Sequence, residues 1–334
     1  MRTMARLDKA FYGAFPVPFD DHSKLVFFSD VHRGDDSISD EFGRNKHIYY
    51  YALNHYYRND YTYIEVGDGD ELIEQRKFKH IRNAHPAIFK VLKQFYDDNR
   101  LYMLYGNHNI QLKDEQWVKD NYYSFIDEFS GIEEDLFPGI YVHEALILKH
   151  RDTGQEIFVV HGHQGDLMND QLHIIPKIMI SIFWKYLHIA GFQYAASPSK
   201  SRQKRHKVEK NFSKWTDKHG ITIICGHTHR PVYPKQGESN YFNTGCCIHP
   251  RGIQCIEITY GKIRLVNWIV SSRKDGTMYI KRKVLKGPSS LVTFAEDAIS
   301  APHSKEFLHT NHNGNKLRRL QKREFKAEEK GHET

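Results

Sequence analysis

The sequence predicts an α/β protein with a largely parallel sheet, on three observations. Five apolar runs typical of buried strands are spread along the 334-residue chain: residues 24–29, 61–66, 101–105, 157–160 and 221–225. Helix-like segments separate the first three runs, which is the pattern of parallel crossovers. A short polar cluster follows each run, and ligands bind beyond the carboxyl ends of strands in open α/β sheets.

Two helices are predicted in the first half. Residues 42–57 follow the first strand and its loop and lead into the strand at 61–66. Residues 80–97 place Ile88, Phe89, Leu92 and Phe95 at helical spacing before the strand at 101–105. The first half is therefore expected to consist of β-α-β units.

The pattern of predicted secondary structure changes after the fifth cluster. Residues 240–244, 253–259, 262–270 and 277–283 are short strand-like runs separated by turns. They predict a largely antiparallel sheet that packs on the first one.

A helical insertion is predicted at about residues 167–215, because fifty residues without a ligand-like cluster are too long for an unstructured connection. One helical face there is apolar, with Lys177, Ser181, Lys185 and His188 on the other. The helix could pack in the core, form a lid over an apolar substrate, or contact lipid at the surface. Lys177 and Lys185 argue against a transmembrane span. The apolar face comprises Ile174, Ile175, Ile178, Met179, Ile182, Phe183, Tyr186 and Leu187.

The predicted organisation is a catalytic domain at 1–285, containing the insertion, and a basic, flexible tail at 286–334. A net charge of +7 favours anionic partners without choosing among them. Two basic stretches, 200–214 and 316–330, are each typical of a solvated helix face or a disordered end. The four cysteines have no framework spacing, and the first residues lack the apolar core of a signal peptide. We expect a cytoplasmic protein, with peripheral membrane contact as an alternative.

The five polar clusters predict a site for two divalent cations. Asp68 follows a strand on a Gly-Asp turn and is the natural bridging carboxylate. One ion would take Asp30, His32 and His229, and the other would take Asn107, His161 and His227. Mixed imidazole and oxygen ligation suits manganese, iron or zinc better than calcium. Any one cluster alone is more often a cap or a satisfied core group, but five in series, each after a strand, are hard to explain in that way.

The clusters together resemble the calcineurin-like metallophosphoesterase superfamily over about residues 24–270. Its D-x-H, G-D-x-x-[DNE], G-N-H-[DEN], later His and G-H-x-H motifs correspond here to five segments: 30–32, 67–71, 106–109, 161–163 and 226–229. The resemblance implies a four-layer α/β/β/α sandwich, a dinuclear centre and hydrolysis of phosphoric esters. The chain departs from the pattern at Asn109, where the family more often has an acidic residue that helps to orient His108.

A narrower resemblance, to the branch that contains UDP-diacylglucosamine hydrolases, depends on the insertion, residues 161–166 and the turn at 242–245. It implies a nucleotide-lipid pyrophosphate as substrate and an acyl-binding lid, although the insertion could equally shield a soluble substrate.

The predicted mechanism is hydrolysis of a phosphomonoester, phosphodiester or pyrophosphate by a hydroxide that bridges the two cations. His108 is predicted to stabilise the transition state or to act as general acid. Glu71, His163 and Asp166 are expected to hydrogen-bond the ligands. Arg33 is expected either to neutralise a phosphate oxygen or to lie exposed on the surface.

The sequence is also compatible with other functional classes. The expected substrate is a phosphorylated small molecule or a lipid-linked compound. A nuclease would use the basic stretches as a backbone track, but no clustered aromatic and basic stacking motif supports this. A non-catalytic binding module on the same fold would have lost ligands, and here every ligand position is filled. The oligomeric state has no signature in the sequence.

Overall fold

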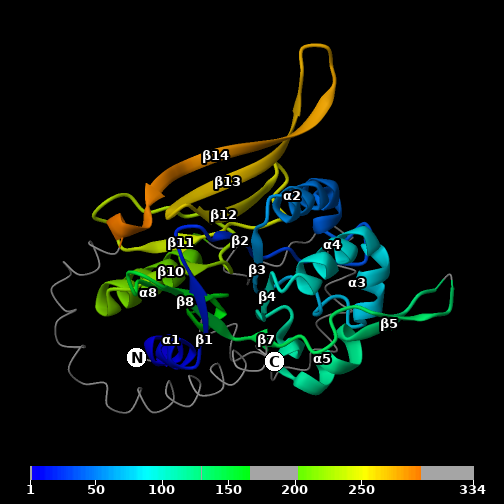
Figure 1. The fold of residues 1–334 in the computed structure, drawn as a ribbon, viewed down its shortest axis with the longest axis horizontal. Coiled ribbons are helices and arrows are strands. Elements are labelled where there is room, and N and C mark those ends of the chain that lie inside the picture. The colour runs from blue at the N-terminus through cyan, green and yellow to red at the C-terminus, as the bar shows by residue number, and fades with distance from the viewer. Residues whose placement is uncertain (1, 129, 166–201, 295–334) are drawn as a thin grey trace, which may run out of the picture.

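The computed structural model describes residues 2–128, 130–165 and 202–294. Two β-sheets pack face to face, and helices cover the outer face of each sheet (Figure 1). This arrangement confirms the predicted α/β class and its four α/β/β/α layers. The predicted amphipathic helix at 174–187 and residues 295–334 of the predicted tail lie outside the described residues. No helix in the described ranges is both long enough and apolar enough to span a bilayer.

The larger sheet has seven strands in the order β14-β13-β12-β2-β3-β4-β7. Its parallel half consists of β2 (Lys24–Phe28), β3 (Thr62–Val66), β4 (Leu101–Leu104) and β7 (Val142–His143). Its antiparallel half consists of β12 (Ile253–Thr259), β13 (Lys262–Ser272) and β14 (Met278–Ser290). The helices on its outer face are α2 (Lys46–Arg58), α3 (Phe78–Ala84), α4 (Pro86–Asp97) and α5 (Glu115–Tyr122). A hairpin of β5 (Ser124–Ile126) and β6 (Glu133–Asp135) follows α5.

The smaller sheet has five strands in the order β1-β8-β9-β10-β11. These are β1 (Phe15–Phe19), β8 (Ala145–His150), β9 (Glu156–Val160), β10 (Thr222–Cys225) and β11 (Tyr241–Asn243). Only the β8–β9 pair is antiparallel. Helices α1 (Arg2–Tyr12) and α8 (Arg202–His219) cover its outer face.

Apolar side chains on both faces of each sheet build three cores. Between the sheets, Leu25 and Ile64 from one sheet pack with Val159 and Ile224 from the other. Because the inner strands are buried on both faces, their sequences are almost continuously apolar rather than alternating. The predicted helix at 80–97 corresponds to α3 and α4, and its four spaced apolar residues are buried.

The distribution of strands between the sheets differs from the prediction. The strands at 157–160 and 221–225 belong to a second, mostly parallel sheet, which β11 extends at its edge. The antiparallel strands β12 to β14 do not form a separate sheet, because β12 pairs directly with β2. In that position Ile256 packs between the sheets while Cys255 packs under the helices, so one strand completes two cores.

Two predicted boundaries fall inside regular elements. Residues 202–215 of the predicted insertion lie within α8, where Phe212 and Trp215 pack against the smaller sheet. The basic stretch there is a helix face with Lys207, Lys210 and Lys214 exposed. The boundary at 285 lies within β14, and the chain then turns inward, so that Leu291 and Phe294 are buried between the sheets.

Candidate metal centre

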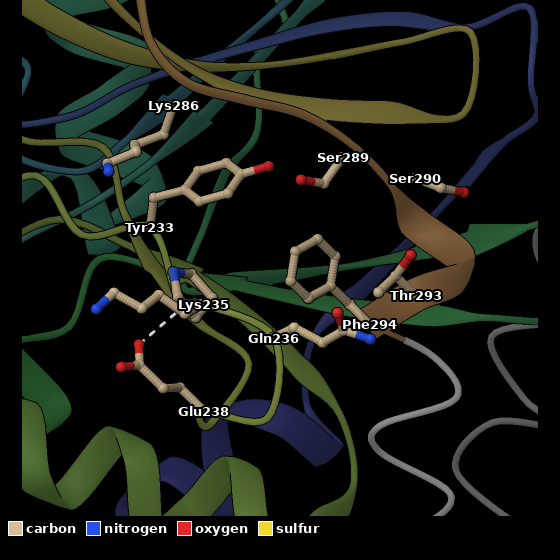
Figure 2. Close-up of a pocket in the computed structure, with 10 residues that line it drawn as sticks. Tyr233, Lys235, Gln236, Glu238, Lys286, Ser289, Ser290, Thr293 and Phe294 are labelled. Carbon is tan, nitrogen blue, oxygen red and sulfur yellow. Dashed lines mark hydrogen bonds between the residues drawn. The ribbon is translucent and has the colours of Figure 1, made fainter.

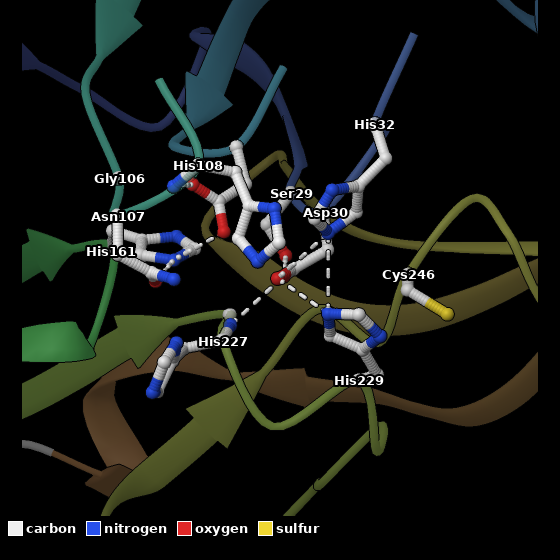
Figure 3. A network of polar contacts seen from close by, with 12 residues as sticks. Ser29, Asp30, His32, Gly106, Asn107, His108, His161, His227, His229 and Cys246 are labelled. Atoms are coloured by element: carbon white, nitrogen blue, oxygen red, sulfur yellow. Dashed lines mark hydrogen bonds and ion pairs between the residues drawn. The ribbon is translucent and has the colours of Figure 1, made fainter. Parts of the chain in front are cut away.

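The five predicted clusters meet at one edge of the sandwich. Loops that leave β2, β3 and β4 of the larger sheet face loops that leave β9 and β10 of the smaller one. Figure 3 shows the side chains converging from these loops. The structure thus brings together all seven residues predicted as metal ligands, although they span almost 200 positions: Asp30, His32, Asp68, Asn107, His161, His227 and His229.

The first group consists of Asp30, His32 and His229, whose ligand atoms all lie within 4.8 Å of one another. Asp30 Oδ1 lies 3.0 Å from His229 Nε2, and the Nε2 atoms of the two histidines are 3.3 Å apart. The other oxygen, Asp30 Oδ2, accepts hydrogen bonds from the His227 backbone N–H at 2.8 Å and from Ser29 Oγ at 2.5 Å. One carboxylate oxygen is therefore held by the protein and the other faces the imidazoles.

The second group consists of Asp68, His161 and His227, which are all buried. His161 Nδ1 donates to the Val66 carbonyl at 2.9 Å, so its Nε2 faces Asp68 Oδ2 at 3.1 Å and Asn107 Oδ1 at 3.3 Å. A backbone partner on one ring nitrogen is how proteins orient a ligating histidine. The amide oxygen of Asn107, a predicted ligand, thus lies beside this group.

The pKa values of Asp30 and His161 are shifted because carboxylates and imidazoles lie close together. Burial works against ionisation, but His229 and His161 hold the pKa of Asp30 well below its usual range. In the same way, burial favours neutral His161, but the Asp68 carboxylate raises the pKa of His161 to about 9. Buried carboxylates and imidazoles therefore depend on one another for charge compensation.

The backbone at the ligands is strained. Five of the seven ligand candidates have positive φ: Asp30 (49°), His32 (51°), Asp68 (52°), His227 (67°) and His229 (54°). Such conformations are uncommon outside glycine, cost about 1–3 kcal/mol each and cluster at functional sites. Their concentration here indicates that the loops are held in place for side-chain geometry.

Two motif glycines are explained by close approach of a ligand. A methyl group at Gly106 would overlap Asp68 Oδ1, and one at Gly226 would overlap Ser29 and Asp30. Each motif therefore makes room for a ligand contributed by a different motif.

A third group joins His32, Glu71 and His108. Glu71 Oε2 lies 2.8 Å from His32 Nδ1 and 2.7 Å from His108 Nδ1. Burial opposes protonation, but Glu71 and Asp68 raise the pKa of His108 to about 10. His108 is 31% exposed, against 0% for Asp30 and His161, so it lies at the mouth of the site.

The departure at Asn109 is balanced by Glu71. Asn109 Oδ1 accepts a 2.6 Å hydrogen bond from the Gly106 N–H and shapes the turn rather than contacting the His108 ring. The acidic partner of His108 comes instead from Glu71.

Arg33 lies in neither predicted environment. It is fully buried, with Nη1 and Nη2 at 2.6 and 2.9 Å from the Glu65 carboxylate and Nε at 2.7 Å from Asp70 Oδ1. A guanidinium that is fully buried and paired in this way beneath the loops is not exposed to a phosphate in the cleft.

His163 and Asp166 are the other residues predicted to hydrogen-bond the ligands. His163 is buried behind His161, with ring centroids 5.5 Å apart, and burial lowers its pKa well below the usual value. Among the described residues His163 Nδ1 has no hydrogen-bond partner, so the predicted bond to a ligand is not seen there. Asp166 lies outside the described residues.

Sequence reasoning missed Ser29 and Thr244. Ser29 Oγ lies 2.5 Å from both Asp30 Oδ2 and Thr244 Oγ1, and so links the first ligand to the turn before Gly245. The position of Ser29, immediately before Asp30, was the available signal.

A separate hollow of about 510 Å³ lies between the loop after β10 and the end of β14 (Figure 2). Tyr233, Lys235, Lys286 and Phe294 contribute to its lining. None of the candidate ligands lines it, so it is not the predicted site.

No protein-family model matches the chain, and no curated protein matches it. Solved structures that resemble it include a cold-active protein-tyrosine phosphatase of a psychrophilic Shewanella species, at 14% identity and a TM-score of 0.37, covering 82% of this chain and 84% of that one. Vps29 of Chaetomium thermophilum is 8% identical, with a TM-score of 0.32 and coverage of 80% and 97%.

GAP50, described as the anchor in the inner membrane complex of Plasmodium, is 13% identical, with a TM-score of 0.35 and coverage of 84% and 95%. At these scores the likenesses carry no argument about function. The functional argument rests on the site.

Proposed function

We propose that the chain is a metal-dependent phosphoric ester hydrolase with two divalent cations. Asp30, His32 and His229 would hold one ion, and Asn107, His161 and His227 the other, with Asp68 between them. The observation that carries the proposal is the meeting of two buried carboxylate and imidazole groups at one edge of both sheets.

The donor atoms suit such ions. Within the described part of the chain, buried Asp30 Oδ1 has no hydrogen-bond partner with suitable geometry, and it lies 3.0 Å from His229 Nε2. The Nε2 atoms of His32 and His229 face each other at 3.3 Å. Buried polar atoms normally have partners, and a cation would satisfy all three at once. Nitrogen with carboxylate and amide oxygen favours manganese, iron or zinc.

The cations, when bound, would lower the pKa of a water and offset charge on the phosphate. The chain supplies the remaining functions. Glu71 Oε2 lies 2.7 Å from His108 Nδ1, and the half-buried ring of His108 lies at the mouth of the site. In the metal-free chain burial opposes protonation, but Glu71 and Asp68 raise the pKa of His108 to about 10, and a protonated ring at this position is suited to give a proton to the leaving oxygen.

The type of bond remains a prediction: a phosphomonoester, a phosphodiester or a pyrophosphate. The assignment to nucleotide-lipid pyrophosphates depends on the insertion, residues 161–166 and the turn at 242–245, and much of the insertion lies outside the described ranges. It stays a prediction, as do manganese as the metal and the cytoplasmic location. A non-catalytic module has no observation in its favour, because a charged His108 lies beside a full set of ligands.

The test is a substrate panel with added Mn²⁺, Fe²⁺ or Zn²⁺. It would compare a nitrophenyl monoester, a bis-nitrophenyl diester, a nucleotide-sugar pyrophosphate and single-stranded DNA. Asn107→Ala should lose bound metal by elemental analysis. His108→Ala should keep metal and lose turnover by on the order of 100-fold. Turnover of the intact chain on none of these compounds, or full activity of His108→Ala, would contradict the proposal.

A further inference from the structure

Strands β13 and β14 continue beyond the rest of the larger sheet as a two-stranded arm. Pairing of β12 with β13 ends at Ile253↔Trp268, whereas β13 runs on to Ser272 and pairs there with Met278 of β14. Figure 1 shows this ribbon projecting from the body. We call residues 267–283 the arm. Isolated two-stranded ribbons are marginal in water, so a projecting one suggests a binding role.

The arm leaves the sheet at the edge that carries the metal ligands. The Cys247 N–H donates to the Asp30 carbonyl at 3.1 Å, just before β12 begins. Gln254 of β12 donates to Asn267 Oδ1 at 3.1 Å, and Asn267 pairs with Lys283. Two strand spacings, about 10 Å, separate β13 from β2, and Ser272 extends about 13 Å past Trp268.

The two faces of the arm differ. Trp268 and Ile280 pack on the helix side of the sheet. Val270 lies two residues after Trp268, and Met278 lies two residues before Ile280, so both side chains are on that same side. Tyr279, Lys281 and Lys283 lie on the opposite side, which faces the smaller sheet. The metal ligands lie between the two sheets, so the lysine row is on the same side as the site.

The arm carries a surplus of positive charge. Arg273, Lys274, Lys281 and Lys283 are exposed and have no ion-pair partner within the described ranges. Arg282 differs, because it pairs with Glu257. The one acid, Asp275, caps the turn by accepting from the Thr277 N–H at 2.9 Å. This surplus of positive charge favours an anionic partner.

We propose that the substrate is a nucleic-acid strand whose backbone runs from the metal ligands along Lys281 and Lys283 to the tip of the arm. This inference rests on the proposed phosphoesterase function and names its substrate class. Phosphates spaced along a chain match a row of lysines. Tyr279, with Arg273 5.6 Å from its ring, offers a surface for a base.

A lipid surface fits the arm less well. Its most exposed apolar side chains, Val270 at 47% and Met278 at 65%, lie on the helix side. A bilayer that reached the metal site would meet the lysines and leave these side chains in water.

The test is fluorescence anisotropy of a labelled 20-nucleotide single strand with the full chain, in chelator so that nothing is hydrolysed. Lys281→Gln with Lys283→Gln should weaken binding about tenfold at 50 mM salt. The slope of log affinity against log salt should fall by about 1.4, because each phosphate contact of a single strand contributes about 0.7. The matched control is Lys90→Gln with Lys119→Gln, the same charge change on exposed positions of α4 and α5.

Equal losses in the control, or an unchanged slope in the arm variant, would overturn the inference. So would binding to phosphatidylserine vesicles without binding to the oligonucleotide. Turnover of bis-nitrophenyl phosphate by the intact chain separates the two proposals: a chain that hydrolyses this small diester but does not bind the strand would refute the inference and leave the proposed function standing. A chain that binds the strand through the arm but hydrolyses no ester would refute the proposed function and leave the arm's role standing.

Discussion

Arg33 ties together the loops that carry the first two ligand clusters. Its backbone N–H donates to the Gly69 carbonyl and its carbonyl accepts from the Glu71 N–H, at 2.9 and 3.0 Å. Its side chain neutralises Glu65 and Asp70, which are 2% and 1% exposed. The residue therefore supports the loops on either side of Asp68 without entering the cleft.

Replacing Arg33 with Met should destabilise the fold strongly. The change leaves two buried carboxylates without a counter-charge, which costs about 3–5 kcal/mol. Urea denaturation of the metal-free chain would measure the loss in free energy of unfolding. Lys93→Met is the control, because it breaks an exposed pair with Asp97 worth about 0.3–0.5 kcal/mol. Similar losses for both variants would show that the network does not hold the loops.

The burial of Arg33 could have been predicted from Glu65, its partner in the ion pair, more readily than from the residues next to it in the sequence. Glu65 is a charged residue inside an otherwise apolar strand, and such a residue needs a buried partner. The partner lies 32 positions earlier, and nothing local in the sequence specifies that pairing.

At the scale of elements, the segment that follows β14 belongs to the core between the sheets. Phe294 is 3% exposed and meets the Phe242 ring edge to face at 5.0 Å between centroids. Leu291 is buried beside it. The chain therefore closes the sandwich beyond the boundary predicted at residue 285.

Phe294→Ala should lower the free energy of unfolding by about 3–5 kcal/mol, because it removes a buried ring and leaves a cavity. Thermal and urea denaturation would measure the change. Val292→Ala is the control two residues away, since Val292 is 51% exposed and its truncation should cost little. A loss below about 1 kcal/mol for Phe294→Ala would show that this segment is not part of the core.

Five strands and their ligand loops could be predicted because each combines an apolar run with a polar cluster. The runs at 24–29 and 221–225 correspond closely to β2 and β10, yet these strands lie in different sheets. An inner strand that is buried on both faces shows no alternation, so its sequence does not reveal which strand lies beside it. The positive φ values of Asp30 and His229 are equally hidden, because Asp and His adopt such values only at a minority of positions and the sequence does not show which.

For the whole molecule, the site joins the two sheets. Asp30 and Asp68 come from the larger sheet, whereas His161 and His227 come from the smaller one. Ligands that bind only the folded state stabilise it by mass action. Cations shared between the sheets should therefore stabilise the entire sandwich and not just the loops.

The protonation of His161 determines how folding stability and metal affinity change with pH. Its pKa of about 9 in the metal-free chain means that the protonated ring pairs with Asp68. That pair contributes stability below the unfolded value of about 6.5, and the contribution is lost as pH rises through about 9. A ligating ring must be neutral, so metal binding releases this proton and strengthens about tenfold per pH unit below pH 9.

The stabilisation by metal should therefore grow with pH. With Mn²⁺ at 100 times its dissociation constant at pH 8, the gain is about 2.7 kcal/mol, and the hundredfold weaker affinity at pH 6 reduces it to about 0.4 kcal/mol. Melting temperatures with Mn²⁺ and with chelator, compared at both pH values, would measure this. His161→Gln should abolish most of the difference, whereas His22→Gln, at an exposed position, should retain it. A gain that is equal at both pH values, or larger at pH 6, would mean that His161 does not exchange its proton for a cation.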